Sequence, residues 1–324
     1  MSLELSCSFA TSPESPEHAR IAESLGYRRA FFNDSPALYP DVWVQLCRAA
    51  ERTARIGLGP GVLIPSLRHP MTNAAAIATL VGLAGAERVV VGVGSGFSGR
   101  MAMGQRAMRW RDVAVYVRTL RGLLRGEQVR WEGQPIQMLH TPGFAPPRPL
   151  EVPFIIAAGG PKGIAVAHEV GDGIAGGEPI GGFAWSITFT AGTVLEAGEE
   201  PDAERPRAAA GHGASLWLHY GAEHGLLDTL LPEQGRQWLS AYDAVPAESR
   251  HLAMHYGHLV LVNEYDRPYV TGALLTKFGL ALSAAGWRER LTQWEAAGAT
   301  EVAYQPAGPA IARELEAFIN AARS

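Results

Sequence analysis

The chain has 324 residues, of which 47% are hydrophobic and 19% are charged, and its formal net charge is −4. This charge balance offers no basic stripe for nucleic acid or an anionic membrane, so we expect neither as a partner. Two cysteines, Cys7 and Cys47, exclude a disulfide framework. The start shows no secretion signal, and no apolar run is long enough to span a membrane, so we expect a cytoplasmic protein.

Strands alternate with helices through the first half of the chain. A glycine at position 26 ends the first predicted helix, and four valines predict a strand that is buried on both faces. The predicted strands cover Leu3–Phe9, Arg29–Asn33, Ile56–Ile64 and Arg88–Val93, and the helices cover Pro16–Leu25, Tyr39–Thr53, Pro70–Ala84 and Trp110–Leu124.

The second half continues the alternation less regularly. It is predicted to hold a hairpin (Gln128–Trp131 with Pro135–Leu139), a strand from Val152, a helix (Pro161–Val170), strands at Asp172–Ala175 and Ala208–His219, a helix (Trp287–Ala297), a strand (Thr300–Tyr304) and a helix (Ile311–Ala322). Eight such strands predict an α/β fold, a (β/α)8 TIM barrel with insertions, as one domain over residues 1–324. A doubly wound sheet would place its glycine motif after the first strand, where none occurs.

Small residues follow two of the buried strands. Gly94, Ser95 and Gly96 come after the fourth strand, and the segment from Ala158 to Gly160 comes after the fifth and before a helix. Such loops let a phosphate or a flat ring approach the backbone, although they also serve as plain tight connections. Two of them together predict one anionic cofactor that is held from two sides.

With these segments placed, the chain resembles the luciferase-like superfamily, in particular the branch similar to methylenetetrahydromethanopterin reductase. The resemblance is carried by Asp34–Tyr39, Leu58–Pro65, Arg68–Pro70, Ala78–Leu80, Gly92–Gly96, Leu120–Glu127 and Ala157–Lys162. It implies a barrel that binds a flavin, either the deazaflavin F420 or FMN, at the carboxyl ends of its strands. It also implies a cis peptide at Gly61–Val62, against which the ring lies. The two loops would hold the phosphate-bearing tail, and Lys162 either pairs with that tail or is solvated.

The same resemblance selects residues around the expected ring. Asp34 and Ser35 follow the second strand, where related enzymes often carry a histidine, and they are the predicted catalytic residues, although Asp34 is equally suited to capping its loop. Phe97 stands where sugar-phosphate dehydrogenases of the family place a glutamate. We expect Phe97 and Gln305 to line the substrate pocket.

The histidines outside this region suggest structural roles. His251, His255 and His258 have helical spacing that can build a metal site, but no glutamate completes a metalloprotease motif. We therefore expect a histidine-rich helix face and no metal. For His69, which lies just beyond the third strand, we expect either support of the residues that contact the cofactor or a role at the helix entry, rather than catalysis.

Three functions remain open from the sequence. The favoured one is an F420-dependent oxidoreductase that transfers a hydride to or from a small organic substrate. The alternatives are an FMN-dependent monooxygenase served by a separate flavin reductase, and a non-catalytic cofactor-binding barrel. Apolar residues near the expected rim favour an uncharged or partly apolar substrate, and a homodimer is the expected oligomer if one forms.

Overall fold

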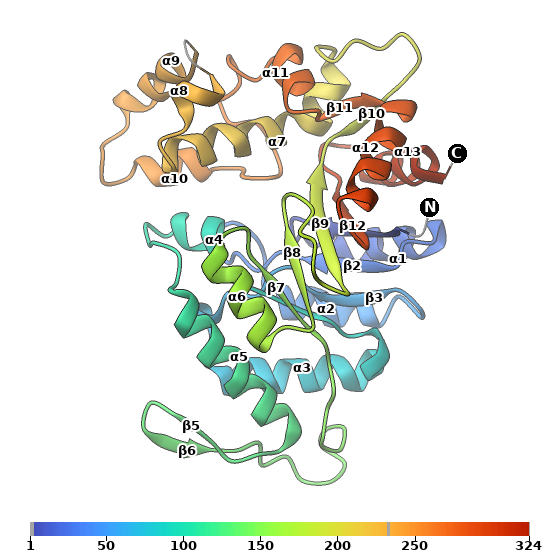
Figure 1. Ribbon diagram of the computed structural model, residues 1–324, viewed down its shortest axis with the longest axis vertical. Helices are drawn as coiled ribbons and strands as arrows, with labels where there is room; N and C mark the ends of the chain where they lie inside the picture. Colours follow the sequence, from blue (N-terminus) through green and yellow to red (C-terminus); the bar gives the residue numbers. More distant parts are fainter. Residues whose placement is uncertain (1–2, 232–233, 324) are drawn as a thin grey trace. The chain divides into compact units, whose positions relative to one another are not determined.

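Eight parallel strands form the central sheet of the computed structural model, which describes residues 3–231 and 234–323 (Figure 1). They are β1 (Glu4–Phe9), β2 (Arg29–Phe32), β3 (Gly57–Pro60), β4 (Val91–Gly94), β7 (Phe154–Ala157), β8 (Gly173–Gly176), β9 (Ser186–Ala191) and β12 (Glu301–Gln305). The strand order is β3-β2-β1-β12-β9-β8-β7-β4. Bridges Leu58–Val89 and Leu63–Val93 join the two ends of this order, so the sheet forms a nearly closed barrel. The predicted fold class is confirmed.

Helices follow the strands along the chain, as in other barrels of this class. The main ones are α1 (Ser15–Leu25), α2 (Val42–Ala50), α3 (Pro70–Ala84), α5 (Trp110–Arg125) and α6 (Pro161–Val170), with short turns at η1 (Pro65–Leu67), η2 (Ala86–Arg88) and α4 (Phe97–Met101). In α5, Val113, Val117, Leu120 and Leu124 are buried, whereas Val115 is half exposed, as expected of an amphipathic helix. Beyond α5 lies the predicted hairpin, β5 (Val129–Trp131) with β6 (Gln134–Ile136).

The barrel interior is filled by side chains from several strands. Its central cluster contains Phe31, Val90, Ile155, Ala175, Ile187 and Ala303. The Phe31 ring meets the ring of Phe189 edge-on, with centroids 5.8 Å apart. Because these buried side chains pack against one another, the barrel interior is a filled core.

The chain divides into two compact units. The first comprises Met1–Arg100, Arg106–Phe189 and Trp294–Ala303, and the second comprises Met101–Gln105, Thr190–Gln293 and Tyr304–Ser324. The single-domain organisation over residues 1–324 stays a prediction. None of the described helices is long and apolar enough to cross a membrane.

The second unit is mainly helical. Its elements are β10 (Thr193–Leu195), α7 (Glu204–Glu223), α8 (Leu227–Leu230), α9 (Gln234–Ala241), η3 (Tyr242–Ala244), α10 (Arg250–His255), α11 (Gly272–Lys277), β11 (Ala281–Ser283), α12 (Ala284–Ala296) and α13 (Ile311–Arg323). The end of α12 belongs to the first unit, and the last residues of the barrel strands β9 and β12 belong to the second. Leu218 of α7 packs in one apolar cluster with Trp238, Tyr242 and Leu275, all nearly inaccessible to solvent.

One predicted strand is wrong. The segment Ala208–His219 is helical and lies within α7, and the seventh barrel strand is β9, in a region predicted to be irregular. Ala210, Ala214 and Leu218 are buried at a spacing of four residues, which is a helical period. Small side chains on all faces of this segment hid that period in the sequence.

Candidate functional site

The carboxyl ends of β2, β3, β4 and β7 bring the two predicted small-residue loops together. Gly94 of β4 pairs with Ala157 of β7, so the loops that follow these strands start side by side. At the end of β3, the Gly61 amide donates to the Phe32 carbonyl of β2 at 2.8 Å. The predicted proximity of the loops Gly94–Gly96 and Ala158–Gly160 is therefore confirmed. Their joint binding of a cofactor stays a prediction.

The Gly61–Val62 peptide is cis, as expected. Val62 lies against the glycines of β4: a Cβ added at Gly94 would stand 2.7 Å from Val62 Cγ2, and one at Gly92 would stand 2.7 Å from the Pro60 carbonyl oxygen. Side chains do not fit at such separations, so β4 needs these glycines to pack against β3. The Gly94 amide also donates to the Leu63 carbonyl at 3.1 Å. The glycine pattern of β4 thus has an explanation within the protein.

The segment Ala158–Gly160 has a different environment. A Cβ added at Gly159 or Gly160 would meet nothing within 4 Å, and both residues are exposed. Among the described residues, their amides have no hydrogen-bond acceptor. Gly160 is the N-cap of α6, and Pro161 occupies the first turn. Free amides at a helix N-terminus favour an anion, so this segment fits the anionic tail of a flavin or deazaflavin.

Lys162 adds a positive charge next to this segment. It is exposed in the first turn of α6, and no carboxylate of the described residues forms an ion pair with it. The sequence left open whether this lysine binds the tail or is solvated. The structure is compatible with a role as a point charge for an anion.

Asp34 is buried in an ion pair with Arg68. Nη1 of Arg68 lies 2.8 Å from both carboxylate oxygens of Asp34, and the Ile64 amide donates to Oδ2 at 3.3 Å. Burial raises the pKa of Asp34, and the guanidinium of Arg68 opposes this shift. The aspartate therefore connects the loop after β2 to the loop after β3, and it caps no helix. Its predicted catalytic role stays a prediction.

Arg68 is the residue at this site that the sequence analysis missed. Its Nη2 lies 2.7 Å from Oδ2 of Asp41, and its carbonyl accepts a hydrogen bond from the Tyr116 hydroxyl at 3.0 Å. Asp41 also caps α2 by accepting from two amides of its first turn. The sequence did contain a signal for this ion pair, because Asp34 and Arg68 have opposite charges and follow neighbouring predicted strands. The expected helix-entry role of His69 is confirmed, because its Nδ1 accepts from the Met71 amide and caps α3.

The remaining predicted site residues lie at strand ends. Ser35 is buried in the loop after β2, where a Cβ added at Gly99 would stand 2.8 Å from its Oγ. Phe97 begins α4 and is half-buried. Gln305, at the end of β12, is 9% exposed, and its Nε2 has no partner among the described residues. Their predicted catalytic and substrate-binding roles are untested.

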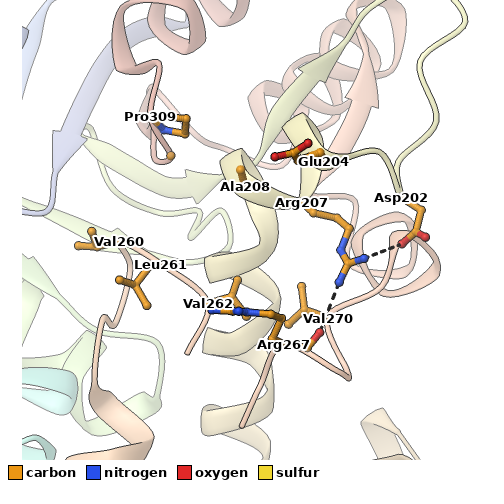
Figure 2. A pocket seen from close by; sticks show the side chains of 11 residues that line it. Asp202, Glu204, Arg207, Ala208, Val260, Leu261, Val262, Arg267, Val270 and Pro309 are labelled. Carbon is orange, nitrogen blue, oxygen red and sulfur yellow. Dashed lines mark hydrogen bonds and ion pairs between the residues drawn. The ribbon is translucent and has the colours of Figure 1, made fainter. Parts of the chain in front are cut away.

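The second unit contains a cavity of about 840 Å³ that the sequence analysis did not predict (Figure 2). Arg207 extends between Asp202, with which it forms an ion pair at 4.0 Å, and the Arg267 carbonyl at 3.4 Å. Both charged and apolar side chains line it: Asp202, Glu204, Arg207, Ala208, Val260, Leu261, Val262, Arg267, Val270, Gly308 and Pro309. None of the predicted site residues is among them.

The family model described as luciferase-like monooxygenase matches residues 10–268. The chain belongs to this family. The 5,10-methylenetetrahydromethanopterin reductase of Archaeoglobus fulgidus is 29% identical over 162 residues, which are 48% of this chain and 47% of the relative. An F420-dependent glucose-6-phosphate dehydrogenase of Beutenbergia cavernae is 34% identical over 171 residues, 47% of this chain and 49% of the relative. The chain thus matches about half the length of these curated relatives.

Solved structures share the luciferase-like fold over nearly the whole chain. The coenzyme F420 dependent tetrahydromethanopterin reductase from Methanopyrus kandleri aligns with a TM-score of 0.65 at 18% identity, covering 98% of this chain and 97% of that one. The oxygenating constituent of 3,6-diketocamphane monooxygenase from Pseudomonas putida, in complex with FMN, aligns with a TM-score of 0.64 at 13% identity, covering 99% and 97%. At these identities the likeness establishes the fold.

Proposed function

We propose that this luciferase-like protein is an oxidoreductase that uses F420 to transfer a hydride to or from a small organic molecule. The observation that carries the proposal is the pair of exposed glycines Gly159 and Gly160, whose amides have no hydrogen-bond acceptor among the described residues and which follow β7, the strand paired with β4. The names of the curated relatives support F420 over FMN, because several are F420-dependent dehydrogenases. FMN is the alternative, supported by the FMN complex of a monooxygenase with this fold.

The chain offers separate groups for the two ends of such a cofactor. The amides of Gly159 and Gly160 and the N-terminus of α6 bind the anionic tail, with Lys162 as an added charge. The end of β3 at Gly61–Val62 supplies the surface for the ring. Bound F420 would supply a carbon centre that gives or accepts two electrons together with a proton, as a hydride.

Residues around the ring then orient the substrate. The Asp34–Arg68 ion pair holds the loop of Ser35 in place, so we assign Asp34 a positioning role and Ser35 the proton-carrying hydroxyl. Phe97 forms an apolar wall, which favours an uncharged or partly apolar substrate. Nε2 of Gln305 has no partner among the described residues, and its part in substrate binding stays a prediction. A homodimer, and a flavin reductase partner in the FMN case, stay predictions.

An anaerobic turnover experiment tests this function. Reduced F420 is mixed with the protein and a panel of small aldehydes, ketones and imines, and oxidised F420 is mixed with the corresponding alcohols. We expect at least one pair to change the visible absorbance of F420 at a rate proportional to protein concentration. Substrate oxidation only with reduced FMN and oxygen would replace this proposal with the monooxygenase. Absence of any turnover together with absence of cofactor binding would contradict both.

A further inference from the structure

Three buried histidines of the second unit bring their rings together. The ring centroids of His219 and His255 are 5.6 Å apart, those of His255 and His258 are 5.3 Å apart, and those of His219 and His258 are 5.8 Å apart. One nitrogen of each ring lies within 4.8 Å of the others. His219 comes from α7, whereas His255 ends α10 and His258 follows in the next turn. The cluster therefore joins two segments that are distant in the sequence.

Asp266 orients the first of these rings. Its Oδ2 lies 3.0 Å from Nε2 of His219, and its Oδ1 accepts from the Trp238 indole at 2.8 Å and from the Tyr242 hydroxyl at 2.7 Å. The nitrogen of His219 that remains for another partner is Nδ1. A buried carboxylate that fixes one nitrogen of a histidine, while the other faces a ligand, is the usual outer shell of a metal site.

Two ring nitrogens in this cluster lack a partner. Nδ1 of His219 and Nδ1 of His255 are buried without a hydrogen bond to any described residue. Buried polar atoms are nearly always paired, so each such nitrogen requires an explanation.

We propose that His219, His255 and His258 bind a divalent transition-metal ion of the zinc type. Three neutral imidazoles are a known donor set for zinc, and they leave a fourth position for water. Tetrahedral Zn–N bonds of about 2.0–2.1 Å would place the ligand nitrogens about 3.3 Å apart, so metal binding would draw the three rings closer together. The carboxylate of Asp266 would balance part of the added charge. The metal would connect α7 to the end of α10 and stabilise this part of the second unit.

This site is independent of the proposed hydride transfer. The sequence analysis considered His251 with His255 and His258 and expected no metal. In the structure, His219 takes the third position and His251 is outside the group. Nothing in the sequence indicated His219 as a third ligand, because it lies on α7, far along the chain from His255 and His258.

The test uses the full chain without a histidine tag, stripped with a chelator and then titrated with Zn²⁺ by calorimetry and with Co²⁺ by visible absorption. We expect one equivalent of zinc per chain, the strong visible bands of four-coordinate cobalt, and a higher Tm with metal. His255→Ala should weaken zinc binding by about 100-fold or more, and Asp266→Asn by about 10- to 100-fold. His251→Gln, one turn before His255, is the matched control and should keep the affinity of the unchanged chain.

Two results would overturn the site. One is a wild-type chain that takes up no stoichiometric zinc, or that gives only the weak bands of six-coordinate cobalt. The other is a folded His255→Ala variant that binds zinc as the unchanged chain does. If His255→Ala fails to fold, the cobalt spectrum of the unchanged chain decides the question, since it needs no variant.

Discussion

Nη1 of Arg68 lies 2.8 Å from both carboxylate oxygens of Asp34, and the aspartate side chain is only 1% exposed. This ion pair joins the loops that follow two adjacent barrel strands, where active sites of this fold are built. Removing one member of a buried pair leaves the other charge without compensation. We therefore expect the ion pair to stabilise these two loops against each other.

Arg68→Met should lower the free energy of unfolding by about 3–5 kcal/mol, because it leaves Asp34 buried and unpaired. The matched control is Asp41→Asn, which removes the more exposed partner of Arg68 and keeps a residue suited to cap α2. Its loss should stay below about 1 kcal/mol. Urea unfolding measures both values, and equal losses would show that Arg68 is not held mainly by Asp34.

Gly159→Glu should weaken cofactor binding at least about tenfold, or ~1.4 kcal/mol, because it places a bulky anion in the open segment before α6. Stability should be unchanged, since a side chain there meets nothing within 4 Å. Ala165→Glu adds the same charge at an exposed position of the same helix and should leave the affinity intact. Fluorescence titration with F420 measures both variants. An unaffected Gly159→Glu would remove this segment from the site.

Gly94→Ala should lower the stability of the chain, whereas Gly159→Glu should leave it unchanged. Its Cβ would stand 2.7 Å from Val62 Cγ2, so β3 and β4 would have to shift, at a cost of about 1–3 kcal/mol in stability. Gly159→Ala, at the open position, is the control and should unfold as the unchanged chain does. Thermal unfolding distinguishes the two, and a stable Gly94→Ala would mean that β4 does not need its glycine for packing.

Glu23 gives a prediction for the dependence of stability on pH. Its carboxylate accepts hydrogen bonds from the amides of Ala54, Arg55 and Ile56. Burial by itself would raise the pKa of Glu23, but these amides outweigh it and lower the pKa below 4.5. The stabilisation is therefore present above about pH 4.5 and is lost as the pH falls through the lower, folded-state pKa.

Glu23→Gln should thus cost about 1.5–3 kcal/mol at neutral pH, and this difference from the unchanged chain should shrink below pH 4.5. Glu316→Gln, at an exposed position of α13, should cost nothing measurable at any pH. Denaturant unfolding across the acid range provides the measurement. A difference that stays constant with pH would show that the charge of Glu23 is not what the three amides bind.

The sequence predicted those features that depend on local patterns. The valines of β4 and the glycine at position 26 marked a strand and a helix end, because burial and backbone conformation restrict residue choice there. Features that depend on tertiary contacts were missed or misassigned. The packing of the β4 glycines against Val62, which follows β3, could not be read from the sequence, and the part of these glycines in cofactor binding stays a prediction. Likewise, nothing local connects Asp34 with Arg68, or His219 with the histidines after it.

The choice of cofactor is tested by a parallel titration of the purified chain with F420 and with FMN, followed by fluorescence and visible absorption. We expect saturable binding of F420 at one equivalent per chain, with an affinity at least about tenfold higher than that for FMN. The Gly159→Glu variant should lose this preference. Tighter binding of FMN, or no binding of either cofactor by the folded chain, would contradict the proposed use of F420.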